Sequence, residues 1–542
     1  MLRLGPYKAL NAWLSRHWAS ALFVLCALGI WGWVSWEAVY VRMITWEGGA
    51  DYWEHSASLH ALIENPWHPR HPHLAITAGS PRFGPQFLLV ALIARAVHFD
   101  AVQAMALTAV LNTLLFLYGV RVFFLGYFRH PLAPLYGLLV MFGGWWHGFH
   151  YSNVYSLPVL FAVASFPSTT ALGLTLLGFS LAVRLLRGEV RRPRLCLLVL
   201  GLWAAAVFII HPLTAMMSIS GAFLLALAEP RPSLRLRLEL AGAVVVGLAL
   251  SHFWPYFSPW VVLRGGHGSS ADWAAHSLQQ AADLHMKRRL HMFYRTSGLL
   301  QTLGVAALTG LCLPYFFFRR ARLFVSLGAL GMLVPYIANI FVEIPLGHRF
   351  LLLAIVYLHI GLVGLLLRLT PGHMGTFRFL RRRAVAFVSA LLVAALLVVF
   401  SAHSVLETER HIAEPRFRGR ESPVVLNMRE LAAVMGPHAV VLTNPLLSWP
   451  LPTFGPKVLV LHHDDPLVPD AVEREFWVKR FLGSGGSDEE RAAILARYGV
   501  THVAVQREAG PMARFLAKSS IDRVVAGGLH VYTIAPGQPK ER

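Results

Sequence analysis

The feature that most constrains this chain is a succession of apolar runs, each close to the length that crosses a bilayer. A spanning helix needs roughly 20 predominantly apolar residues. About eleven runs approach this length: they cover residues 18–41, 101–120, 132–147, 167–185, 196–211, 213–228, 240–256, 297–316, 323–341, 349–367 and 385–402. The first run is too long for a signal peptide and lacks a cleavage site of small residues, so we expect it to be retained. The sequence therefore predicts an α-helical polytopic membrane bundle with about eleven transmembrane helices.

Composition excludes the other broad classes. Of 542 residues, 56% are hydrophobic and 14% charged, whereas about 25% of the residues of a soluble domain are charged. A cytosolic enzyme and a disordered scaffold are therefore excluded. The three cysteines, Cys26, Cys196 and Cys312, lie in apolar runs, which argues against a disulfide-stabilised secreted module. Lys and Arg outnumber Asp and Glu by 48 to 28, but this excess lies in short loops that orient a membrane protein, so we expect no nucleic-acid partner.

The basic loops set the topology. Clusters at 121–129, 184–194, 231–237, 319–322 and 378–383 are expected on the cytoplasmic side. A further apolar stretch at 83–97 would reverse this alternation if it crossed, and its length of about 15 residues is too short to span. We therefore expect an interfacial helix there. The N-terminus is then cytoplasmic, and everything after residue 401 lies outside.

The chain divides into two predicted domains. Residues 1–402 form the transmembrane domain, with a first external loop at 43–100. Residues 403–542 form a small C-terminal α/β extracytoplasmic domain, because strand-like runs at 438–443, 457–461, 500–506 and 529–534 alternate with helical stretches at 425–435 and 488–498. The glycine-rich run 483–487 lacks the ending of a phosphate loop and is interpreted as a flexible connection.

The first external loop carries the densest polar constellation, at residues 46–56. Helical spacing places Asp51 and His55 on one face, four residues apart. Such a pair can serve as a general base or hold a metal ion, or it can be an incidental pair on a solvated helix face. The histidines of 65–73 are separated by prolines, which break any local ligand geometry, so zinc is disfavoured there.

Cations stand at two further places. Lys287, Arg288 and Arg289 lie in a loop that the topology places outside, against the charge bias. Either the topology differs at this loop, or the cations bind a phosphate ligand or anionic lipid headgroups. Arg349, after His348, opens the tenth run and either reaches the membrane surface or points into the bundle and holds a phosphate. In the tail, the cluster at 462–465 directly follows a strand and is interpreted as a turn rather than a metal site.

These motifs resemble a known family. A first span is followed by Gly-Gly-Ala-Asp51-Tyr-Trp-Glu-His55 and then by Gly79-Ser-Pro-Arg82-Phe-Gly-Pro85. This arrangement resembles the first span and first periplasmic loop of the GT-C superfamily of polytopic glycosyltransferases. The motifs at 166–168 and 347–350 and the mixed α/β tail extend the resemblance. It implies an inverting membrane glycosyltransferase of hexosyl or pentosyl type, working in polysaccharide or cell-envelope biosynthesis. The donor would be a polyprenyl-phosphate-linked sugar, the acceptor an envelope lipid, glycan or protein, and the location the outer face of a bacterial inner (plasma) membrane.

The resemblance also implies roles for single residues. By position, Asp51 maps onto the catalytic base and Glu47 is the reserve candidate. Arg349 maps onto the residue that contacts the lipid phosphate. The other candidate substrate-binding residues are His55, Arg82, Lys287, Arg288, Arg289 and His348. Some members carry two adjacent acidic residues where this chain has Ala50-Asp51-Tyr52, so the choice of carboxylate stays open, as does a divalent metal, Mg or Mn, on Asp51 and His55.

The main alternative is a polytopic transporter or lipid flippase with an external accessory domain. Transporters usually show paired, Gly/Pro-interrupted spans and ionisable groups at the midplane. Here the charges cluster at helix ends, which favours chemistry at the membrane interface. A structural factor whose tail docks a partner would leave the first-loop acid and the external cations without a role.

Overall fold

The computed structural model describes residues 5–41, 50–145, 152–263, 293–314, 323–342, 344, 346–369, 422–463, 465–506 and 510–535. The chain forms two compact units. The helical unit comprises residues 1–36, 109–251 and 275–415, and the loop–tail unit comprises 37–108, 252–274 and 416–542. The first external loop and the C-terminal tail, far apart in the sequence, therefore belong to one unit.

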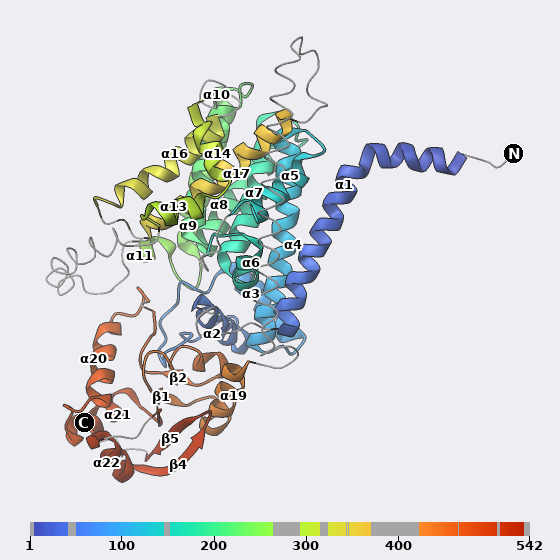
Figure 1. Cartoon of the computed structure of the whole chain (residues 1–542). Coiled ribbons are helices and arrows are strands. Elements are labelled where there is room, and N and C mark those ends of the chain that lie inside the picture. Colours follow the sequence, from blue (N-terminus) through green and yellow to red (C-terminus); the bar gives the residue numbers. More distant parts are fainter. Residues whose placement is uncertain are drawn as a thin grey trace. The chain divides into compact units, whose positions relative to one another are not determined.

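The helical unit is built from long apolar helices packed side by side (Figure 1). Its helices, some of which begin or end in the other unit, are α1 (Gly5–Trp36), α4 (Ala101–Phe128), α5 (Ala133–Gly143), α6 (Leu157–Val163), α7 (Pro167–Leu186), α8 (Pro193–Ile210), α9 (Pro212–Ala228), α10 (Leu234–Leu250), α13 (Thr296–Leu303), α14 (Ala306–Leu311), α16 (Leu323–Ala338) and α17 (Phe350–Leu369). Proline at the first position of α7, α8 and α9 fixes where each begins.

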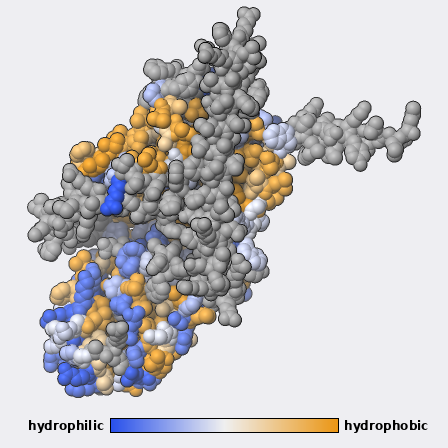
Figure 2. Space-filling model, viewed as in Figure 1, coloured by the Kyte–Doolittle hydropathy of each residue, from blue (hydrophilic) through white to orange (hydrophobic). Residues whose placement is uncertain are grey.

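Six described helices are long and apolar enough to cross a membrane: Trp18–Val39, Ala101–Phe128, Pro167–Leu186, Pro193–Ile210, Leu234–Phe253 and Gly347–Arg368. Large apolar side chains such as Leu25, Leu198 and Val245 are more than half exposed. In Figure 2, hydrophobic residues make up most of the coloured surface of the helical unit. Such exposure suits lipid rather than water. The predicted polytopic helical fold is confirmed.

Individual runs differ from the prediction in detail. The run expected at 297–316 is interrupted at Gly304, which separates α13 from α14. The φ angle of Gly304 is +51°, a backbone conformation that glycine adopts without strain. The stretch at 83–97 is indeed a short helix, α3 (Pro85–Ala96). The run expected at 385–402 lies outside the described residues.

A five-stranded sheet organises the loop–tail unit, in the order β2-β1-β3-β5-β4. The strands are β1 (Val440–Leu442), β2 (Lys457–Val458), β3 (His502–Val505), β4 (Ser520–Ala526) and β5 (Leu529–Ile534). β1 is parallel to β2 and β3, and β5 is antiparallel to β3 and β4. The small α/β tail is therefore confirmed, and β4, which was not predicted, exposes most of its side chains and so lacks a buried apolar pattern.

Helices of the tail cover this sheet: α19 (Pro423–Met435), α20 (Ala471–Leu482), α21 (Asp488–Tyr498) and α22 (Gly510–Ser519). Successive strand residues point to opposite faces, so Leu442 and Val503 pack in one core cluster and Val441 and Ala504 in another. The glycine-rich run before α21 ends in a capping box, in which Ser487 caps the helix and Glu490 bonds back to it.

The first external loop packs on the edge of the sheet. It consists of helix α2 (Ala50–Glu64), an extended segment and α3. Leu74 forms a parallel bridge with Val458 of β2, whose amide donates to the carbonyl of His73 at 2.8 Å. The Lys457 ammonium also donates to the Pro72 carbonyl at 2.9 Å. The loop thus continues the sheet beyond its β2 edge.

Candidate functional site

Helix α2 brings the predicted acid and imidazole together. Asp51 lies in its first turn, where the helix dipole favours a negative charge, and His55 follows one turn later on the same face. Both side chains are half-buried. Glu54, three residues after Asp51, is 3% exposed. The helix therefore carries one half-buried carboxylate and one buried carboxylate.

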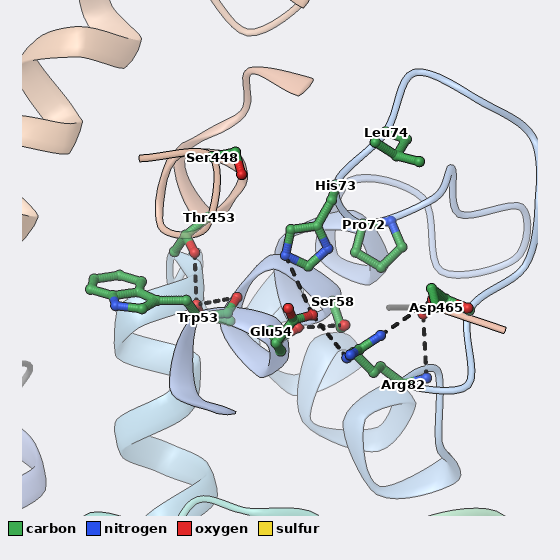
Figure 3. A network of polar contacts seen from close by, with 12 residues as sticks. Trp53, Glu54, Ser58, Pro72, His73, Leu74, Arg82, Ser448, Thr453 and Asp465 are labelled. Carbon is green, nitrogen blue, oxygen red and sulfur yellow. Dashed lines mark hydrogen bonds and ion pairs between the residues drawn. The ribbon is translucent and has the colours of Figure 1, made fainter. Parts of the chain in front are cut away.

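Arg82 links Glu54 to the tail (Figure 3). Its Nε lies 2.9 Å from Glu54 Oε2 and its Nη1 lies 3.2 Å from Asp465 Oδ2. Both carboxylates are almost fully buried, and the Arg82 side chain is 19% exposed. Charge-assisted bonds of this kind are strong and directional. A single guanidinium thus connects a first-loop helix with the segment that follows β2.

Asp465 is held by several further donors. Its Oδ2 accepts from Ser80 Oγ at 3.1 Å and lies 3.4 Å from His71 Nε2, while its Oδ1 accepts from the Leu467 amide at 3.0 Å. Burial alone would raise the pKa of Asp465, but the hydrogen bond from His71 and the charge of Arg82 outweigh it and lower this pKa. Asp465 is therefore ionised at neutral pH.

The net pKa shift of Glu54 has the opposite sign to that of Asp465. Burial, its largest influence, raises the pKa of Glu54 to about 7 although the Arg82 charge opposes this, and the Asp51 and Asp465 charges raise it further. The His73 Nε2 lies 3.6 Å from Glu54 Oε2. Burial lowers the pKa of His73 well below its usual value. Near neutral pH the cluster therefore contains a neutral His73 and a Glu54 that is partly protonated.

His55 is also neutral under these conditions. Its ring packs against Phe87, with centroids 5.3 Å apart. Burial lowers its pKa to about 4, although the Asp51 charge opposes this shift. His55 can thus exchange hydrogen bonds with a substrate but adds no positive charge to the site.

Asp51 and His55 are the expected metal ligands. Among the described residues, no group of three or more His, Cys, Asp or Glu side chains is arranged to hold a metal ion. Asp51 and His55 would supply two protein ligands, and Mg²⁺ in proteins commonly keeps several water ligands. A divalent metal on this pair remains a prediction.

Four residues of the cluster were not predicted. Glu54 stood in the quoted motif, and its spacing of three from Asp51 already put both on one helix face. His71 and His73 flank one proline in an extended segment, where residues two apart share a face; both are nearly fully buried. Asp465 belongs to the cluster at 462–465 that was interpreted as a turn; its contacts could not be predicted locally, because its partners come from the first loop.

The late residues His348 and Arg349 belong to the helical unit. They lie in a short 3-10 turn, Gly347–Arg349, directly before α17, and the His348 ring stacks on Phe293 with centroids 5.5 Å apart. Asn339 orders this turn: its Oδ1 accepts from the Ile344 amide at 3.0 Å. Glu47 and the cations Lys287, Arg288 and Arg289 lie outside the described residues.

Comparisons with known proteins identify the fold. No family model and no curated protein matches the sequence. The crystal structure of ArnT from Cupriavidus metallidurans in the apo state matches 97% of this chain and 98% of its own chain, with 15% identity and a TM-score of 0.55. The cryo-EM structure of the arabinofuranosyltransferase AftD from Mycobacteria matches over 83% of this chain and 35% of its own, with 16% identity and a TM-score of 0.42. Since the likeness to ArnT spans nearly the whole of both chains and six described helices are long and apolar enough to cross a membrane, this chain is an integral membrane protein with the polytopic helical fold of ArnT.

Proposed function

We propose that the protein is an inverting glycosyltransferase that moves a sugar from a polyprenyl-phosphate donor to an envelope lipid, glycan or protein. Transfer would take place at the outer face of a bacterial inner membrane. The observation that supports this proposal is the half-buried carboxylate of Asp51 in the first turn of α2, within the electrostatic influence of the ordered Arg82, in a chain with the fold of ArnT.

The chemistry follows from a base and a departing phosphate. Asp51 takes the proton of an acceptor hydroxyl while that oxygen attacks the anomeric carbon. The new carbon–oxygen bond forms on the face opposite the phosphate. The bond between the anomeric carbon and the phosphate oxygen breaks, and the polyprenyl phosphate leaves with the electron pair. Arg349, with Lys287, Arg288 and Arg289, would stabilise the charge that develops on this phosphate.

Asp51 is a better base than Glu54 because a base must reach the acceptor. Glu54 is 3% exposed and its carboxylate is paired with Arg82, whereas Asp51 is half-buried. Arg82 itself already faces two buried carboxylates, so its positive charge is largely compensated. We therefore assign Arg82 mainly to ordering the site and propose that the other cations bind the lipid phosphate.

The test uses the full chain in liposomes that contain a polyprenyl-phosphate-linked sugar. We expect Asp51→Asn to lower transfer by about 10²- to 10⁴-fold, the contribution typical of a general base. Asp522→Asn, on the exposed strand β4, is the matched control and should transfer normally. An active Asp51→Asn protein would contradict the assignment of the base.

The same liposomes separate the enzyme from a transporter or flippase. A glycosyltransferase releases polyprenyl phosphate in step with sugar transfer to an acceptor. A flippase moves the intact lipid-linked sugar between leaflets and releases none. Movement of the donor without release would therefore exclude the proposed reaction.

A further inference from the structure

The tail contributes a carboxylate that the first loop almost surrounds. Asp465 Oδ2 faces Arg82 Nη1 at 3.2 Å, Ser80 Oγ at 3.1 Å and His71 Nε2 at 3.4 Å. All three partners come from the loop between α2 and α3. Asp465 therefore connects the tail directly to the turn that contains Arg82.

We infer that Asp465 is a positioning residue for sugar transfer: it holds the Arg82 guanidinium against Glu54 and thereby fixes helix α2, which carries Asp51. This inference rests on the proposed function. It gives the C-terminal tail a part in catalysis that does not depend on contact between the tail and the substrate.

The geometry of Arg82 supports this role. Its Nε is bound to Glu54 and its Nη1 to Asp465, so two carboxylates from different segments restrain one planar group. The backbone of the same turn is restrained as well, since the Trp254 indole donates to the Phe83 carbonyl at 2.8 Å. Arg82 is thus fixed at both its side chain and its neighbouring backbone.

Docking of the loop does not depend on Asp465. The Val458 amide bonds to the His73 carbonyl, and the Lys457 ammonium bonds to the Pro72 carbonyl. These contacts to β2 stay in place when the Asp465 charge is removed. The specific contribution of Asp465 is therefore the orientation of Arg82 rather than attachment of the loop.

Release of Arg82 would affect the base directly. The charges of Asp51 and Arg82 influence one another. A guanidinium that loses Asp465 keeps only its Glu54 partner and can shift toward the Asp51 carboxylate. An ion pair there would occupy the oxygen that must accept the proton. We expect the loss to fall on kcat more than on KM for the donor, because substrate contacts are not removed.

The experiment compares three variants of the full chain in liposomes. Asp465→Asn should lower kcat by about 10- to 100-fold, the size of effect expected from a misplaced catalytic group, while KM changes little. Asp465→Glu, which restores the charge, should recover part of kcat. Asp470→Asn removes a tail carboxylate that pairs with Arg474 instead and should transfer normally. A wild-type kcat in Asp465→Asn, or an equal loss in Asp470→Asn, would overturn the inference.

A second readout is independent of transfer. Hydrogen–deuterium exchange of residues 71–84 should become faster in Asp465→Asn and stay unchanged in Asp470→Asn, whether or not any acceptor is known. Unchanged exchange in Asp465→Asn would refute the positioning role. Absence of transfer by the wild-type chain, with exchange altered as expected, would instead refute the proposed function.

Discussion

Arg82 and Glu54 form an ion pair of 2.9 Å in the interior of the loop–tail unit. Removing one partner of a buried pair leaves the other charge without compensation. Because Arg82 also pairs with Asp465, its loss would affect two carboxylates at once. The stability of the loop–tail unit therefore depends strongly on this cation.

We predict that Arg82→Met lowers the free energy of unfolding by about 3–5 kcal/mol. The measurement is thermal unfolding in detergent. Arg70→Met, at an exposed position of the same loop, should have little effect. The double variant Arg82→Met/Glu54→Gln should recover part of the loss, because one of the two stranded charges is removed; no recovery would argue against the pairing.

Glu54 makes stability fall as the pH rises. Its pKa is raised by burial from 4.5 to about 7, so the folded state holds the proton more tightly than the unfolded state. The stabilisation is complete below about pH 4.5 and is lost as the pH rises through 7. Glu54→Gln, a mimic of the protonated form, should remove about 2–3 kcal/mol of the difference in stability between pH 5 and pH 8. Glu430→Gln, at an exposed site on α19, should leave that difference unchanged.

His73 makes stability fall in the acid direction. Burial lowers its pKa well below 6.5, so the unfolded state binds a proton first as the pH falls below about 6.5. His73→Gln should therefore reduce the drop in melting temperature between pH 7.5 and pH 5. His68→Gln is the control, since His68 is exposed. If the melting temperature of His73→Gln fell as much as that of the wild type, other groups would be responsible for the loss of stability in acid.

A substitution at Gly347 tests the role of the turn that contains Arg349. A Cβ at this position would lie 2.4 Å from Asn339 Cγ, closer than packed atoms allow. Gly347→Ala should destabilise the turn by about 1–3 kcal/mol and raise KM for the donor if Arg349 binds its phosphate. Gly331→Ala, on α16 with open space around it, should change neither quantity.

Local patterns in the sequence predicted most of the long apolar helices and four of the five strands, because each run carries its own apolar length or alternation. The tail helices α20 and α22 were not predicted. They also predicted the relation between Asp51 and His55, which depends on helical spacing alone. The contact between Arg82 and Asp465 was not predictable in this way, since the two residues come from separate segments of the fold. Strand β4 was missed because it exposes most of its side chains.

The bridge between Leu74 and Val458 has a consequence for biogenesis. The first loop is synthesised well before β2 and Asp465. Until β2 has been synthesised, the loop lacks the strand that completes it. Assembly of the polar cluster is therefore delayed until β2 and Asp465 have been added, so a chain that stops short of them carries Asp51 but not the support around it.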